Sequence, residues 1–217
     1  MEYTVMPAAD KTAPLVVICG EEESLDELRD ELEKRSDNAC SLVLFRVEDW
    51  NWELSPWPAD PVMKKTEPFG GQADLFLKAI LTEGLPAVLQ EYELQPEWTG
   101  LAGYSLAGLF ALYSMYQTDR FDRYVSASGS MWYPGFVDYC KTHEPKKTPQ
   151  AIYLSLGDAE AKTWHPLLKT VQDCTEAVTA LYQTNKIPVQ YELNPGNHFK
   201  DATIRLAKGI AWILNQD

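Results

Sequence analysis

The residue in this sequence best suited to covalent chemistry is a serine in a glycine-rich stretch. Ser105 lies at the centre of Gly-x-Ser-x-Ala-Gly, between a short apolar stretch and a longer apolar stretch of helical length. This is the context of a nucleophile elbow, a strained strand-to-helix turn in which small residues, here Gly103 and Ala107, let strand and helix approach. The amide of Leu106 would then be one donor of an oxyanion hole. The competing interpretation is a glycine-rich turn with an ordinary serine.

A serine nucleophile needs a base, and the three histidines of the sequence all follow Ser105. His143 lies in a polar loop and is most simply a surface residue. His165 precedes Pro166 at an expected helix start, where it could be a cap or a surface group. His198 follows the last expected strand, so its imidazole should lie at the same sheet edge as Ser105. We therefore predict that His198 is the base, against the alternative of a structural loop histidine.

The carboxylate that orients the base should follow an earlier strand. The expected strand 152–156 is followed by Gly157-Asp158-Ala159-Glu160, which offers two candidate carboxylates. Spacing alone does not choose between Asp158 and Glu160. We favour Glu160, because a carboxylate further round the turn can more easily reach back to His198. The other carboxylate would be a turn or capping residue.

The elements that must position these residues alternate between short apolar runs and longer helical patterns. The expected strands are 15–19, 42–47, 99–102, 124–127, 152–156 and 189–193, with a weaker one at 3–6, and the expected helices are 24–35, 73–92, 106–117, 165–185 and 201–214. Pro86 should bend or split the second helix. Strands that are apolar throughout and separated by helices indicate a mainly parallel sheet covered on both faces. We expect a single α/β domain over residues 1–217.

The connection over residues 48–71 is unusually long and carries Trp50, Trp52 and Trp57. Long connections in compact domains are often functional or strongly self-packed. Because this one follows a strand, it should leave the carboxyl edge of the sheet, where open α/β folds bind ligands. The tryptophans either anchor the connection to the core or form a pocket wall, and the sequence leaves both open.

The charge and cysteine patterns exclude several classes of protein. The net charge is −13, and residues 1–60 carry 15 acidic and 5 basic residues, so a non-specific nucleic-acid binder is not expected. The acidic run of residues 21–31 has the capping-box spacing of Ser24 and Glu27 and indicates a solvated helix face. Four widely spaced cysteines, with no charged and apolar leader, favour reduced thiols in a cytoplasmic protein. No apolar run is long enough for a membrane span, and we expect no metal or cofactor.

With these residues in view, the sequence resembles the putative-esterase group of α/β-hydrolases, which includes the esterase D-like and enterochelin esterase-like enzymes. The segments that carry the resemblance, in the order of the family, are Gly103-Tyr104-Ser105-Leu106-Ala107-Gly108, Ser126-Ala127-Ser128-Gly129-Ser130-Met131-Trp132, Gly157-Asp158-Ala159-Glu160 and Asn197-His198-Phe199. Together with residues 15–20 and 49–58, these segments are spread along nearly the whole chain. The resemblance implies an α/β-hydrolase fold with a sheet of about six to seven strands.

The same resemblance implies roles for individual residues. It supports Glu160 by position as the triad acid, and it places the second oxyanion amide at Gly20 or Glu21. That segment lacks an HGG-type signature, and the acidic side chains after Gly20 would oppose a developing oxyanion. The short stretch before Leu15 indicates a shortened leading edge of the sheet, and residues 131–150 leave no room for a large lid.

The sequence therefore predicts a lidless serine esterase that acts on a small-molecule carboxylic ester through an acyl-enzyme. Candidates for substrate contact are Tyr104, Trp50, Trp52 and Trp132. Thioester hydrolysis or acyl transfer by the same triad is an alternative, since it differs only in the leaving group or acceptor. A catalytically silent α/β-hydrolase domain used for binding is a further alternative, because fold alone does not establish activity.

Overall fold

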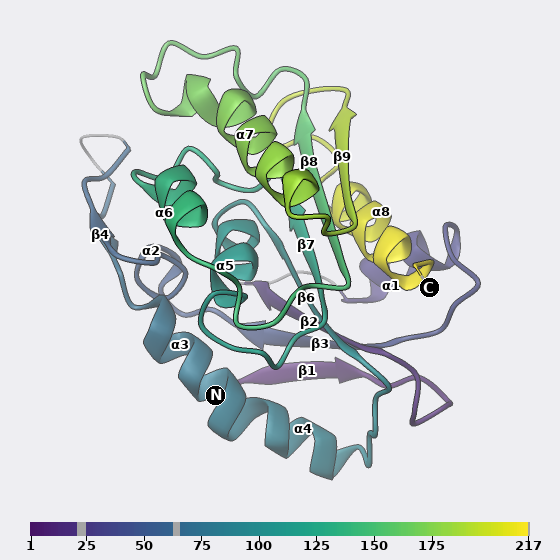
Figure 1. The fold of residues 1–217 in the computed structure, drawn as a ribbon. Helices are drawn as coiled ribbons and strands as arrows, with labels where there is room; N and C mark the ends of the chain where they lie inside the picture. The colour runs from purple at the N-terminus through teal and green to yellow at the C-terminus, as the bar shows by residue number, and fades with distance from the viewer. Residues whose placement is uncertain (21–24, 63–65, 217) are drawn as a thin grey trace.

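The computed structural model describes residues 1–20, 25–62 and 66–216, and these residues form an α/β structure (Figure 1). The strands are β1 (Tyr3–Met6), β2 (Leu15–Gly20), β3 (Ser41–Arg46), β4 (Pro58–Ala59), β5 (Phe69–Gly70), β6 (Thr99–Tyr104), β7 (Arg123–Ala127), β8 (Ala151–Gly157) and β9 (Val189–Asn194). The α-helices are α1 (Leu25–Glu33), α2 (Trp50–Glu53), α3 (Ala73–Ala79), α4 (Leu85–Glu91), α5 (Leu106–Ser114), α6 (Phe136–Thr142), α7 (Val171–Thr184) and α8 (Ala202–Leu214).

The main sheet has seven strands in the order β1-β3-β2-β6-β7-β8-β9. Strand β1 pairs antiparallel with β3, and every other neighbouring pair in this sheet is parallel. The expected mainly parallel sheet is thus confirmed, and its leading edge is one strand of four residues. Because β6, β8 and β9 run in the same direction, the turns that follow them lie at one edge of the sheet.

Helices cover both faces of this sheet. On one face α1 and α8 bury Leu28, Leu32, Ile210 and their neighbours against the side chains of Val16 and Ile18 in β2. On the other face, α3 to α7 pack against Val17, Leu101 and the other strand residues whose side chains point to that side of the sheet. The central strands are therefore apolar on both sides, which explains their unbroken hydrophobic sequences.

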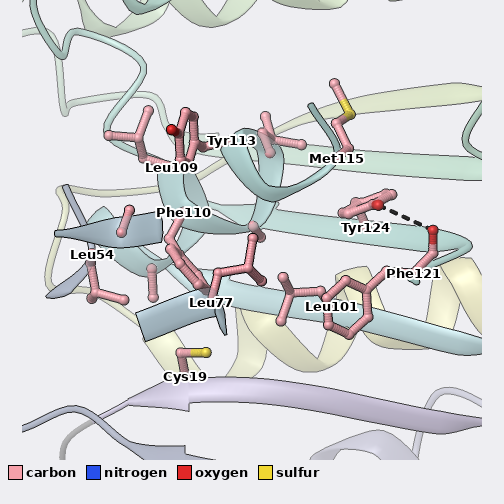
Figure 2. Packing of buried hydrophobic residues seen from close by; sticks show 14 of the residues in the cluster. Cys19, Leu54, Leu77, Leu101, Leu109, Phe110, Tyr113, Met115, Phe121 and Tyr124 are labelled. Carbon is pink, nitrogen blue, oxygen red and sulfur yellow. Dashed lines mark hydrogen bonds between the residues drawn. The ribbon is translucent and has the colours of Figure 1, made fainter. Parts of the chain in front are cut away.

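Helix α5 lies at the centre of the larger apolar cluster, and all nine of its residues are buried. Figure 2 shows Leu109, Phe110 and Tyr113 of this helix among Leu54, Leu77 and the other side chains that surround it. A helix buried on all sides needs no polar face, which is why the sequence over 106–112 shows no amphipathic pattern. The core thus fixes the helix that begins directly after Ser105.

Two of the helices expected from the sequence differ in the structure from one continuous helix over the expected range. The helix expected over 73–92 is split as Pro86 predicted, with a π-helical segment at Ile80–Gly84 between α3 and α4. The helix expected over 165–185 was placed too early, since α7 begins at Val171 after the 3-10 turn Leu168–Thr170. Before that turn, His165 Nε2 donates a 2.7 Å hydrogen bond to the Val62 carbonyl, which binds the segment to another loop instead of continuing a helix.

The 48–71 connection contains α2 and the small β4–β5 hairpin, and Trp57 joins it to the core. Its Nε1 donates to the Pro134 carbonyl at 2.9 Å, and its carbonyl accepts a bond from the Tyr133 hydroxyl at 2.5 Å. The centroid of its ring also lies 5.3 Å from the ring centroid of Tyr139 and 6.3 Å from that of Tyr113. Of the two interpretations of the tryptophans, Trp57 therefore fits the anchor.

Candidate functional site

Ser105 occupies a turn between β6 and α5 in a conformation that few non-glycine residues adopt. Its φ is 58° and its ψ is −120°. Its amide donates to the Ala127 carbonyl at 3.0 Å, and its carbonyl accepts from the Ser130 amide at 3.0 Å, so the segment after β7 holds the strained turn. A Cβ atom on Gly103 would lie 2.3 Å from the carbonyl carbon and oxygen of Ala107. The close approach of strand and helix therefore requires glycine at position 103.

His198 lies in the loop between β9 and α8 and faces Ser105. Its Nε2 is 2.9 Å from Ser105 Oγ, and its Nδ1 is 2.7 Å from Oε2 of Glu160. The imidazole side chain is 32% exposed, so it remains accessible from solvent. A carboxylate can only accept from Nδ1, which leaves Nε2 as the acceptor for the serine hydroxyl when the imidazole is neutral.

Glu160 is the carboxylate that the turn after β8 brings to His198. Its side chain is only 4% exposed, and its second oxygen, Oε1, accepts hydrogen bonds from the Gly157 amide at 2.6 Å and Arg205 Nη1 at 3.0 Å. Burial raises the pKa of this carboxyl group, but the bonds from His198 and the Gly157 amide outweigh burial, and the net pKa lies below its ordinary value. Glu160 is thus held as a carboxylate beside the imidazole.

Asp158, the other candidate acid, has a different position. Its Oδ1 accepts a 2.9 Å hydrogen bond from the Gly196 amide, and its own amide donates to the Asn194 carbonyl at 2.8 Å. These bonds join the turn after β8 to the loop after β9. Asp158 is therefore a turn residue in this structure, which is the role that the sequence left for the carboxylate not used by His198.

Of the three candidate oxyanion donors, the structure describes Leu106 and Gly20. Leu106 directly follows Ser105 and is the first residue of α5, where backbone N–H groups have no carbonyl partner within the helix. Gly20 ends β2, is buried, and its carbonyl accepts from the Val47 amide at 2.8 Å. Residues 21–24, which include Glu21, Ser24 and the start of the acidic run, lie outside the described residues.

The four candidate substrate-contact residues lie in different surroundings. Tyr104 is partly buried, and its hydroxyl donates a 2.6 Å hydrogen bond to the His198 carbonyl, so its polar end is engaged within the protein. Trp50 packs against the core from α2, whereas Trp52 in the same helix is 43% exposed and lies over Gly70. Trp132 is partly buried against the rings of Phe69 and Tyr133.

The two remaining histidines both lie near helix ends. His143 is exposed, stacks on Tyr139 with ring centroids 3.9 Å apart, and its Nδ1 is 3.0 Å from the Tyr139 carbonyl at the end of α6. His165 Nδ1 accepts from the amides of Leu167 and Leu168 at 3.3 and 3.4 Å, so it caps the turn before α7. Both residues match the non-catalytic interpretations given from the sequence.

Sequence reasoning missed Arg205 and Ser128, which lie next to Glu160. Arg205 Nη1 donates to Ser128 Oγ at 3.0 Å, and Ser128 has a positive φ of 47° directly after β7. The available signal was a cation on the apolar face of α8, since Leu206, Ala207, Ile210 and Ala211 are all buried with Arg205, whereas Lys208, the other cation of this helix, is not among its buried residues. Charged residues are rarely fully buried unless they are paired, so this position pointed to a buried partner.

Several absences hold for the part of the chain that the structure describes. No group of histidine, cysteine, aspartate and glutamate residues there is arranged to hold a metal ion. No helix there has the length and apolar character needed to cross a membrane. Cys40, Cys140 and Cys174 are free thiols, and the first two are buried.

The parallel sheet with helices on both faces and the serine on a strand-to-helix turn define the α/β-hydrolase fold. The family described as Putative esterase matches residues 33–202. The chain therefore belongs to this esterase family, and it is an enzyme of the esterase class.

Solved structures and one curated protein are similar to the chain. An IroE-like serine hydrolase from Shewanella oneidensis is 18% identical with a TM-score of 0.80, over 98% of this chain and 75% of that one. Siderophore hydrolase EstB from Aspergillus nidulans is 18% identical with a TM-score of 0.74, over 97% and 88%. Enterobactin esterase FES from Shigella flexneri, solved with enterobactin, is 20% identical with a TM-score of 0.73, over 97% of this chain and 54% of that one. The Bacillus subtilis (strain 168) protein YbbA, described as uncharacterized, is 23% identical over 81% of this chain and 74% of its own length.

Proposed function

We propose that the protein hydrolyses a small-molecule carboxylic ester with Ser105 as nucleophile, His198 as base and Glu160 as the orienting acid. The observation that carries this proposal is one chain of short contacts, 2.9 Å from Ser105 Oγ to His198 Nε2 and 2.7 Å from His198 Nδ1 to Glu160 Oε2. Nucleophile, base and orienting group within hydrogen-bond reach are the signature of nucleophilic acyl transfer.

In the acylation step, His198 Nε2 takes the proton of Ser105 while Oγ attacks the ester carbonyl carbon. Glu160 stabilises the resulting imidazolium through Nδ1–H. The tetrahedral oxyanion would accept hydrogen bonds from the Leu106 amide and from a second amide, for which Gly20 and Glu21 are the candidates. Collapse of this intermediate breaks the ester C–O bond, and the imidazolium gives its proton to the departing alkoxide.

Deacylation repeats these steps with water as the nucleophile. His198 takes a proton from the water as it attacks the acyl carbonyl, and the proton then returns to Ser105 Oγ when the carboxylic acid leaves. Thioester hydrolysis or acyl transfer would use the same acyl-enzyme. Product analysis separates hydrolysis from acyl transfer, because water yields a free acid and an added alcohol acceptor yields a new ester. Rates on an ester and on the matching thioester separate the two kinds of hydrolysis.

The solved relatives named for siderophore substrates guide the choice of candidate esters. Siderophore esters belong in the substrate panel together with simple alkyl and aryl esters, because the fold is shared over nearly the whole chain. The buried free thiols of Cys40 and Cys140 fit a reducing compartment, which supports the proposed cytoplasmic location.

Labelling with a fluorophosphonate probe, followed by peptide mass analysis, tests the nucleophile directly. We expect one adduct on Ser105 of the wild-type protein and none in Ser105→Ala. Ser36→Ala, a serine change after α1 and away from the candidate site, should label like the wild type. A folded wild-type protein without an adduct would contradict the proposal and favour a silent binding domain.

A further inference from the structure

Arg205 is a cation in the interior of helix α8. Its side chain is only 1% exposed, and the neighbouring positions Leu206 and Gly209 are buried as well. Removing a guanidinium from water is unfavourable unless the group is paired and well hydrogen-bonded. The partners of Arg205 must therefore account for its position, and they all belong to the candidate site or to the loops that form it.

The guanidinium contacts both loops that carry the proposed acid and base. Its Nη1 donates to Glu160 Oε1 at 3.0 Å and to Ser128 Oγ at 3.0 Å. Its Nη2 donates to the carbonyl of Asn197, the residue directly before His198, at 3.0 Å and to that of Pro195 at 3.3 Å. One rigid, planar group thus joins the turn after β8 to the loop after β9.

A further contact extends this network to the residue before the nucleophile. Arg205 Nη1 lies 3.4 Å from the hydroxyl of Tyr104, and that hydroxyl donates to the His198 carbonyl at 2.6 Å. Tyr104 is the last residue of β6 and precedes Ser105. Arg205 therefore contacts the proposed acid directly. It contacts the loop that carries His198, and it contacts Tyr104, which lies directly before the nucleophile.

We propose that Arg205 is a positioning residue that fixes the Glu160 carboxylate, so that Oε2 faces His198, and holds the His198 loop in register with Ser105. This inference rests on the proposed triad and adds to it a residue that does not touch the substrate. Oε1 of Glu160 is bound by Arg205 and the Gly157 amide, which leaves Oε2 for the imidazole. A rotated carboxylate would break this arrangement, and displacements of about 1 Å in such sites can cost about 100-fold in rate.

The charge of Arg205 has a separate effect that a purely structural residue would not have. A cation next to Glu160 opposes the uptake of a proton by the His198–Glu160 pair. Without the Arg205 cation, the His198–Glu160 pair would take up a proton more readily as the pH falls, whichever of the two groups holds this proton. The acid limb of the pH profile for kcat/KM, which reports this protonation in the free enzyme, should then move to higher pH.

Other charged and titratable side chains lie near the pair or on the loops that carry it, within the described residues. Tyr104 comes from β6 and Tyr191 from β9, and Asp158 and Lys200 lie on the two loops. Burial raises the pKa of Tyr191 to about 12 and also raises the pKa of Tyr104, so both hydroxyls stay neutral across the acid limb. All four side chains are also present in Arg205→Lys, which keeps the cation, so a limb that moves in Arg205→Met and not in Arg205→Lys reports the lost guanidinium charge.

The experiment compares Arg205→Met with Arg205→Lys, with kcat expressed per active site after titration with a fluorophosphonate. We expect Arg205→Met to lower kcat about 100-fold and to move the acid limb up by about one pH unit. Arg205→Lys retains the charge and loses the planar fork, so kcat should fall about 10-fold while the acid limb stays in place. Thermal unfolding of each variant gives its folded fraction.

Different outcomes separate this inference from the proposed function. If the wild-type protein is neither labelled nor active on any ester, the proposed triad is wrong and the reaction assigned to it fails. If the wild type is active but both folded variants keep its kcat per active site and its acid limb, Arg205 only stabilises the fold and the inference is overturned. If Arg205→Met does not fold, Arg205→Lys decides, because a kcat equal to that of the wild type would overturn the positioning role.

Discussion

Glu160 binds His198 through one carboxylate oxygen and is itself held through the other. Oε2 lies 2.7 Å from His198 Nδ1, while Oε1 accepts from the Gly157 amide and from Arg205. The carboxylate therefore has both oxygens fixed, and the Glu160 side chain is only 4% exposed. This division of the two oxygens gives Glu160 an orientation that Asp158, bound to the Gly196 amide, does not have.

The first prediction concerns the choice of acid. Glu160→Gln should lower kcat on an activated short-chain ester by about 1,000-fold, because an amide in place of the carboxylate stabilises the imidazolium poorly and favours the wrong tautomer. Asp158→Asn is the matched control and should lose less than about 10-fold, since it keeps an acceptor for the Gly196 amide. The reverse ranking of the two variants would show that Asp158 is the acid.

The second prediction concerns stability and pH. The pKa of Glu160 lies below its ordinary value of 4.5 in the folded protein, so its carboxylate favours folding above the unfolded value, and this contribution is lost as pH falls through the lower folded value. The difference in unfolding free energy between wild type and Glu160→Gln should therefore be full at neutral pH and shrink below pH 4.5. Denaturant titrations at several pH values measure it.

Glu192→Gln is a useful comparison for that measurement. The pKa of Glu192 is also lowered, because bonds from Lys208 and Tyr153 outweigh a burial effect that alone would raise it. Its side chain is 34% exposed, so solvent screens the interaction and the pH-dependent difference should be smaller than for Glu160. A difference for Glu160→Gln that does not change with pH would contradict the buried carboxylate pair.

The third prediction concerns the close approach at the elbow. Gly103→Ala should destabilise the protein by about 2 kcal/mol, because the new Cβ would lie 2.3 Å from the Ala107 backbone. Ala107→Gly should not rescue it, since the two nearest atoms are the carbonyl carbon and oxygen and remain in the double variant. Chemical denaturation of the two single variants and the double variant tests this, and full rescue would show that the Ala107 methyl group is the obstacle.

The fourth prediction separates the two roles considered for the tryptophans. Trp57→Ala removes a ring that packs on Tyr113, Tyr133 and Tyr139, and should cost about 3 kcal/mol of stability. Trp52 is 43% exposed, so Trp52→Ala should cost about 1 kcal/mol. If Trp52 contacts the substrate, KM rises in Trp52→Ala at nearly constant kcat, and an unchanged KM removes it from the list of substrate contacts.

Much of the fold could be predicted from the sequence because its central strands are apolar on both faces. The run from Leu15 to Gly20 is buried at every position, and such runs in a parallel sheet need no alternating pattern to be recognised. Helix α6 was missed, because its seven residues begin after Gly135, which has a φ of 83°, and the stretch has no clear period. Helix α7 was placed early because His165 and Pro166 suggest a helix start, whereas the contact with Val62 is not local in sequence.

In the candidate site, too, local sequence patterns predict the position of some residues, whereas other contacts join residues far apart in the sequence. Ser105 and His198 could be placed because each follows a strand and precedes a helix, and parallel strands bring such turns to one edge. The contact between Arg205 and Glu160 joins residues 45 positions apart, and no local pattern specifies it. The choice between Asp158 and Glu160 likewise depends on which carboxylate the turn directs at His198 and which at Gly196.

The central claim is that Ser105 carries the acyl group during turnover. Wild-type protein mixed rapidly with p-nitrophenyl acetate, quenched in acid and digested should yield an acetylated peptide that contains Ser105. Glu160→Gln should form the same adduct more slowly, and Ser105→Ala should form none. Ester hydrolysis by the wild type without any acetylated Ser105, or with equal turnover in Ser105→Ala, would contradict the account.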